Sequence, residues 1–153
     1  MARLEDLPPA TAQRLRDLEC PTFAATPFVA GPPLARRKVA VVTSAALHPR
    51  GDSPFRPGSA EVRLLPATLG AGDLVMSHVS INYDRGGFQR DLDTVYPLRR
   101  LADMASAGTI GGLAETHYSV MGSTDPKAME ETADRIAGQC RQEAVDAALL
   151  VPV

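Results

Sequence analysis

Short runs of apolar and β-branched residues alternate along this chain with polar segments, and they predict a series of short strands. Residues 38–43 form the clearest run, of the kind that is buried on both faces of a sheet. Residues 61–65 alternate as a second strand, and residues 73–78 form a third. The apolar residues of the final segment, 146–153, predict a last strand.

Three other segments carry helix signals. Residues 10–18 place leucines on one face and precede Pro21. A second helix is predicted to begin near Pro97, whose fixed φ suits a first helical position, and to end at Gly108. A third begins with Asp125 as its N-cap, and apolar residues then recur at helical spacing.

This order of elements predicts an α/β domain with three layers and a mostly parallel sheet. Residues 44–60 and 81–93 are predicted to be long loops. We expect residues 38–153 to form the domain, and residues 1–37 to form an N-terminal helix and a proline-rich strap packed over it. A parallel strand normally leads into another crossover helix. We therefore expect the domain to be the N-terminal half of a larger two-part fold, truncated at its last strand.

The composition narrows the function. A net charge of -2, 5% aromatic residues and no tryptophan argue against nucleic-acid binding. No apolar run reaches the length of a membrane span, and the first residues lack the apolar stretch of a signal peptide, so we expect a cytoplasmic protein. Cys20 and Cys140 belong to no CxxC motif and are expected to be reduced, with Cys140 acting as a small apolar core residue.

All three histidines follow apolar segments, which makes them the first catalytic candidates. If these segments are parallel strands, His48, His78 and His117 lie near the carboxyl edge of the sheet, where each could act as acid, base or ligand. The alternative is that each is a hydrogen-bonded structural residue. Their spacing matches no metal-binding motif, so no metal is predicted.

The densest polar cluster follows His78. Asn82, Asp84 and Arg85 precede a glycine pair, and Arg85 could hold a substrate carboxylate with its two-pronged guanidinium. We take these three as substrate-binding candidates. The alternative for Asn82 and Asp84 is that they are turn residues that bond to their own backbone.

Four blocks, residues 73–84, 91–101, 108–112 and 117–122, resemble the selenoprotein B subunits of glycine, sarcosine, betaine and D-proline reductases. The resemblance runs from about Lys38 to the end. His78, Asp84 and His117 match positions in these blocks, and Tyr118 in the last block joins the substrate-binding candidates.

The resemblance implies an oxidoreductase that cleaves a C–N bond of a small amino-acid-like substrate. In the family, a pyruvoyl group of a partner subunit captures the substrate amine, and a selenocysteine attacks the activated carbon as a selenolate. The resemblance places that selenocysteine just after Val153, in a Sec-Pro-x-Cys setting, at a UGA codon read as a stop. This chain by itself is then expected to bind no cofactor and to be inactive. Its expected partners are a pyruvoyl-containing subunit, a thiol reductant protein and further copies in an oligomer, with no nucleic acid and no membrane.

Two other functions remain open from the residues. The chain could be a non-catalytic α/β module that binds a small ligand or docks on a reductase complex. It could also be a histidine-dependent hydrolase, although it lacks a GxSxG nucleophile motif.

Overall fold

The computed structural model describes most of the chain, namely residues 3–17, 19, 22, 24, 26–80 and 85–153. The strands are β1 (Lys38–Thr43), β2 (Leu47–Pro49), β3 (Arg63–Pro66), β4 (Leu74–Met76), β5 (Gly112–Leu113), β6 (Thr116–Ser119) and β7 (Ala147–Val151). The α-helices are α1 (Pro9–Arg16), α2 (Arg85–Arg90), α3 (Leu98–Ser106) and α4 (Glu130–Gln142). Short 3-10 helices cover Leu4–Asp6, Leu34–Arg36, Ala71–Asp73, Leu92–Thr94 and Pro126–Met129.

The larger sheet is built around β1. This strand pairs in parallel with β7, from Val39 opposite Ala147 to Thr43 opposite Val151. Its other edge pairs in parallel with both β5 and β6, which are therefore two parts of one interrupted neighbour. β3 pairs antiparallel with β6 on the outside. The order across the described sheet is β3, then β6 with β5, then β1, then β7, so the sheet is mostly parallel.

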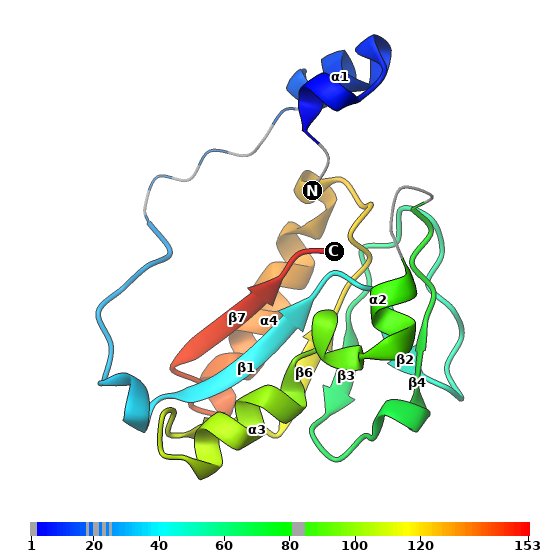
Figure 1. Ribbon diagram of the computed structural model, residues 1–153. Coiled ribbons are helices and arrows are strands. Elements are labelled where there is room, and N and C mark those ends of the chain that lie inside the picture. The colour runs from blue at the N-terminus through cyan, green and yellow to red at the C-terminus, as the bar shows by residue number, and fades with distance from the viewer. Residues whose placement is uncertain (1–2, 18, 20–21, 23, 25, 81–84) are drawn as a thin grey trace.

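Side chains of β1 alternate between two apolar cores, because successive residues of a strand point to opposite faces. Val39 and Val41 belong to a core that includes Leu101 of α3. Ala40 and Val42 pack in a second core, to which α4 contributes partly buried residues. Figure 1 shows α3 and α4 on the two faces of the sheet. The predicted three-layer α/β architecture is confirmed.

Most predicted elements are present, with small shifts at their ends. β1 has its predicted bounds, and the last predicted strand is β7. Gly108 follows α3 and has a φ of 72°, as a helix-terminating glycine requires. The Asp125 side chain accepts a hydrogen bond from the Lys127 amide at 2.9 Å, but a 3-10 turn separates this cap from α4.

Two segments predicted to be loops contain regular structure. Residues 44–60 include β2, which pairs antiparallel with β4 in a separate two-stranded sheet. Residues 81–93 include α2, and residues 81–84 of this segment lie outside the described residues. Buried Leu47 in β2 and partly buried Phe88 in α2 pack in the same core. This burial outweighs the low helix propensity of the two glycines in α2.

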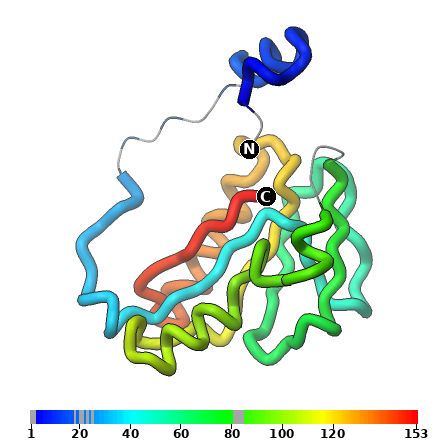
Figure 2. Tube along the Cα trace, viewed as in Figure 1, coloured from blue at the N-terminus to red at the C-terminus, as the bar shows by residue number. Residues whose placement is uncertain are grey.

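The proline-rich strap differs from the packed cover that the sequence predicts. Phe28 and Val29 are 88% and 80% exposed. Figure 2 shows residues 26–37 running outside the sheet before they enter β1. Proline has no amide hydrogen to donate to a neighbouring strand, so this proline-rich segment is poorly suited to extend the sheet.

Two glycine substitutions are expected to have opposite effects on stability. A Cβ at Gly111 would lie 2.4 Å from the carbonyl carbon of Arg36, so Gly111→Ala should lower the free energy of unfolding by about 1–3 kcal/mol. In α4, a Cβ at Gly138 would meet no described atom within 4 Å beyond its own helix, so Gly138→Ala should raise it by about 0.5–1 kcal/mol. Urea denaturation measures both changes. Equal destabilisation of the two variants would contradict this reading of the packing.

Candidate functional site

The connections between strands place a candidate ligand crevice at one edge of the sheet. The chain passes from β1 to β6 with α3 on one face, and from β6 to β7 with α4 on the other (Figure 1). Right-handed crossovers that run in opposite directions produce this arrangement. In open α/β sheets, ligands bind outside the carboxyl ends of the strands, where the direction reverses. That point lies between the ends of β1 and β7.

Ser44, the residue after β1, joins the ends of three strands at this edge. Its amide donates to the Val151 carbonyl of β7 at 3.1 Å, and its carbonyl accepts from the Gly122 amide, beyond β6, at 3.0 Å. Its Oγ accepts a hydrogen bond from the Val153 amide at 2.9 Å. One serine therefore fixes where the chain runs as it leaves β7.

The turn after Ser44 brings the smaller sheet to the same edge. Ala46 is fully buried and has a φ of 53°, which costs a non-glycine residue about 1–2 kcal/mol. Hydrogen bonds hold it there: its amide donates to the Val120 carbonyl at 3.0 Å, and its carbonyl accepts from the Ser77 amide at 3.1 Å. The residue after Ser77 is His78, so this strained turn carries His78 to the crevice.

The imidazole of His78 lies beside Gly122, next to a space that Ser44 also borders. It is only 5% exposed. A Cβ built on Gly122 would lie 3.0 Å from His78 Nε2 and 2.9 Å from both the carbonyl oxygen and the Oγ of Ser44. A side chain at Gly122 would therefore fill the space in which these polar groups meet.

The surroundings of His78 favour its neutral form with the proton on Nε2. The Ser80 amide donates to Nδ1 at 3.2 Å, so Nδ1 carries no proton. Burial lowers the pKa of His78, and the nearby Arg85 guanidinium lowers it further. Arg85 donates to the His78 carbonyl at 2.7 Å and to the Ser80 carbonyl at 3.4 Å, which fixes the backbone of this segment.

His117 is placed differently from the prediction, since it lies inside β6 and not after a strand. It is fully buried, and its Nδ1 accepts a hydrogen bond from the Val41 amide of β1 at 3.0 Å. The Tyr96 ring meets it edge-on, with centroids 5.8 Å apart. Burial lowers the pKa of His117 to about 4, with the Glu143 carboxylate opposing the shift. Its Nε2 is buried without a hydrogen-bond partner among the described residues.

The common placement predicted for the three histidines is wrong, because they do not follow three parallel strands. His48 lies within β2, and His78 follows β4, and these two strands are antiparallel to each other. His48 Nδ1 is 2.8 Å from the Pro49 carbonyl oxygen, and its ring meets Phe55 edge-on at 6.4 Å. Of the three, His78 has described contacts at the crevice, through Gly122.

The substrate-binding candidates also lie in different places, one near His78 and one in the core. Arg85 begins α2 and contacts the backbone of the His78 segment, whereas Asn82 and Asp84 lie outside the described residues. Tyr118 is fully buried in the core beside Cys140 of α4, and burial raises the pKa of its phenol. Because β6 alternates, Tyr118 points to the opposite face of the sheet from His117.

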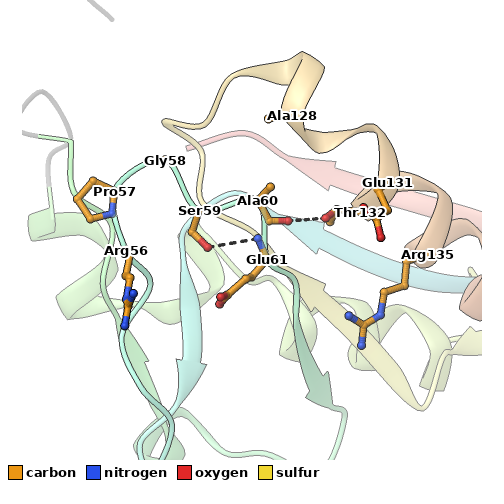
Figure 3. Close-up of a pocket in the computed structure, with 10 residues that line it drawn as sticks. All are labelled: Arg56, Pro57, Gly58, Ser59, Ala60, Glu61, Ala128, Glu131, Thr132 and Arg135. Carbon is orange, nitrogen blue, oxygen red and sulfur yellow. Dashed lines mark hydrogen bonds between the residues drawn. The ribbon is translucent and has the colours of Figure 1, made fainter.

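Sequence reasoning missed Ser44, Ala46 and Gly122. Ser44 and Ala46 belong to no recognised motif, and Gly122 ends the 117–122 block without being singled out there. The roles of all three come from strand ends that are distant in sequence. One available signal was the position of Ser44 directly after the clearest predicted strand, because ligand crevices form at such strand ends. A second missed feature is an open hollow of about 510 Å³ between residues 56–61 and the start of α4 (Figure 3).

Polar groups line this hollow. Figure 3 shows Arg56 and Arg135 at its two sides, with Glu61 and Glu131 also lining it. The Thr132 hydroxyl donates to the Ala60 carbonyl and thereby ties the 56–61 segment to α4. The guanidiniums and carboxylates are balanced in number and exposed, so the hollow shows no preference for a charged ligand.

The described parts of the chain contain no group of three or more histidine, cysteine, aspartate or glutamate side chains close enough to hold a metal ion. Of the two cysteines, Cys140 is a partly buried free thiol, and Cys20 lies outside the described residues. The described helices are all too short or too polar to cross a membrane.

The fold defines a doubly wound α/β protein, with a candidate ligand site at the β1–β7 edge. Comparison with known proteins gives the family. Residues 16–153 match glycine/sarcosine/betaine reductase selenoprotein B, and the chain belongs to this family.

A relative, D-proline reductase subunit gamma from Acetoanaerobium sticklandii, is 34% identical over 115 residues. These residues make up 73% of this chain and 47% of the relative, so the chain spans about half the length of the curated relative it matches. No solved structure matches the chain. The reductase family that the sequence blocks predict is confirmed.

The buried state of His117 predicts a specific loss of stability in mild acid. Its pKa is about 4 in the folded protein and near 6.5 when unfolded, so the unfolded state binds more protons between these values. The neutral imidazole therefore makes its full contribution to the free energy of unfolding above pH 6.5. This contribution falls as the pH drops towards 4, and about 2 kcal/mol of it is lost between pH 7 and pH 5.

The variant His117→Asn tests this, because its Oδ1 can accept the Val41 hydrogen bond but does not titrate. Urea denaturation at pH 7 and pH 5 should show a smaller loss on acidification for the variant than for the natural chain. The comparison is between the change from pH 7 to pH 5 in the variant and the same change in the natural chain, so a destabilisation that is equal at both pH values cancels. An unchanged pH dependence would show that His117 does not contribute in this way.

Proposed function

We propose that this chain is the N-terminal part of a reductase subunit that cleaves a C–N bond of a small amino-acid-like substrate. The nucleophile is a selenolate from a selenocysteine that follows Val153. The observation that carries the proposal is the position of Val153, whose amide is held by Ser44 Oγ at the β1–β7 crevice. Membership in the selenoprotein B family and the half-length match to a reductase subunit support it.

The geometry suits a nucleophile at the next position. Consecutive Cα atoms lie about 3.8 Å apart, so a residue after Val153 begins one step from the backbone that Ser44 Oγ holds. His78 Nε2 lies next to the space that a Gly122 side chain would fill. The crevice is thus formed by the ends of β1, β6 and β7 together with one imidazole.

His78 is proposed to act as a neutral hydrogen-bond donor. Its lowered pKa keeps the ring neutral at pH 7, and the Ser80 contact leaves the proton on Nε2. That N–H can donate a hydrogen bond to an anion in the crevice. Arg85, Asn82 and Asp84 remain proposed substrate contacts, and His48, His117 and Tyr118 remain candidates whose burial favours structural roles.

The proposed partners follow from the chemistry. A pyruvoyl group on a partner subunit would activate the substrate amine. A thiol reductant protein would return the oxidised selenium centre to the selenolate. Such a cycle requires a reducing compartment, and we therefore propose a cytoplasmic, multi-subunit enzyme.

Reading the coding DNA beyond codon 153 tests the nucleophile directly. We expect an in-frame UGA followed by an open frame that begins with proline and a nearby cysteine. The intact mass of the native product, with its selenium content, checks that the codon is translated. A UAA or UAG with no frame behind it would overturn the selenolate mechanism and favour a non-catalytic binding module.

Two substitutions at His78 separate its catalytic role from its structural one. In the complete selenoprotein with its partner subunits, His78→Asn keeps an acceptor near Nδ1 for the Ser80 amide but loses the Nε2 donor. We expect kcat/KM for C–N bond cleavage to fall about 10²–10³-fold. His78→Gln, the matched variant, keeps a donor near Nε2 and should retain more activity.

The substrate panel for this assay is glycine, sarcosine, betaine and D-proline, with thermal denaturation run in parallel. Equal activity loss in the two variants, tracking their loss of stability, would show that His78 is structural. If neither variant loses activity, His78 is not the hydrogen-bond donor.

A further inference from the structure

The outer side of β7 exposes more apolar surface than the rest of the sheet. Leu150 is 68% exposed and Leu149 is 38% exposed, although both belong to a strand of the larger sheet. An apolar hollow of about 370 Å³ lies between this strand and α4. The side chains that line it include Val42, Ile136, Ala137, Cys140, Val145 and Leu150.

The backbone of β7 is also open on this side. All five of its residues pair with β1, and the described residues provide no strand on the other edge. An unpaired edge presents a row of amide and carbonyl groups that readily bind another strand, which soluble proteins normally cover. An open edge next to an apolar hollow is the surface that an additional strand and helix would bury.

The handedness of the fold predicts on which face such a helix would lie. The connection from β6 to β7 runs across the sheet towards the free edge of β7, and its helix α4 covers one face. A further parallel strand beside β7 would continue in the same direction, so a right-handed crossover puts its helix on the α4 face. The residues of β7 opposite Ala40 and Val42 are Ala148 and Leu150, and both line the hollow on that face.

We propose that the hollow between α4 and β7 is the docking site for the chain that follows Val153. A crossover helix packs its apolar side over Leu150, Ala137 and Cys140, and the strand after it pairs in parallel with the free edge of β7. This docking proposal rests on the proposed function, in which the polypeptide continues past Val153. The length of the family supports it, because the matched residues cover only 47% of the curated relative.

Site-directed photo-crosslinking of the complete native product tests this occupant. p-Benzoylphenylalanine replaces Leu150 in one variant and Asp134, which is exposed on α4 and does not line the hollow, in the matched control. We expect the Leu150 probe to crosslink to peptides beyond residue 153 within the same polypeptide. The control should give background yield.

The alternative results are each decisive. Crosslinks from Leu150 to a second copy of residues 38–153, or to residues 1–37, would overturn the proposal, and so would no crosslinks above the control. If the intact mass ends at Val153, the proposed selenolate fails as well. A longer product with an uncrosslinked hollow refutes the docking site alone.

The melting temperature of a variant with a charged side chain in the hollow provides a second test. Leu150→Lys should lower the Tm of the complete product by roughly 4–10 °C, because it removes the burial of one leucine. The same substitution in the 153-residue chain should have little effect, since Leu150 is already 68% exposed there. Leu15→Lys, at a leucine of α1 that is 48% exposed, is the control in both proteins. Equal effects of Leu150→Lys on the two proteins would contradict the docking.

Discussion

The hydrogen bonds that close the break between β5 and β6 hold the larger sheet together. β1 is buried, so its backbone groups need partners even where the neighbouring strand is interrupted. At the break, His117 Nδ1 accepts the Val41 amide, and Glu143 Oε2 accepts the amides of Glu115 and Thr116 at 3.0 and 3.2 Å. Burial opposes the ionisation of Glu143, but the hydrogen bonds from Thr116 and Glu115 outweigh it and the pKa of Glu143 lies below its ordinary value. One side chain from β6 and one from the end of α4 thus accept amides at the break, beside the backbone bond from the Ala114 amide to the Val39 carbonyl at 2.9 Å.

The sequence could predict the elements whose signals are local. The β-branched run of β1, the glycine after α3 and the cap at Asp125 each act within a few residues, and all are present in the structure. It could not predict which strands pair, because pairing joins segments far apart in the chain. β2 and β4 are each only three residues long, and their antiparallel pairing invalidates the argument that placed His48 and His78 at parallel strand ends.

The candidate site was predictable only in part for the same reason. His78 is at the crevice because a strained turn at Ala46 accepts the Ser77 amide, and no periodicity reveals such a contact. His117 has the same residue type but serves the backbone of β1. Histidine identity therefore did not distinguish a crevice residue from a core residue. The family, in contrast, was predictable, because four sequence blocks in order carry more information than any single side chain.

β7 connects the crevice to the apolar hollow, and this makes stability and chemistry difficult to separate. The chain leaves the strand through Val153, which Ser44 holds, while Leu150 faces the hollow only three residues earlier. Exclusion of water strengthens electrostatic interactions in an active site. A cover over β7 would therefore bury exposed leucines and also remove water from the side of the crevice. The covering of β7 and the completion of the candidate crevice are therefore structurally linked, because the same five-residue strand borders the hollow and leads to Val153.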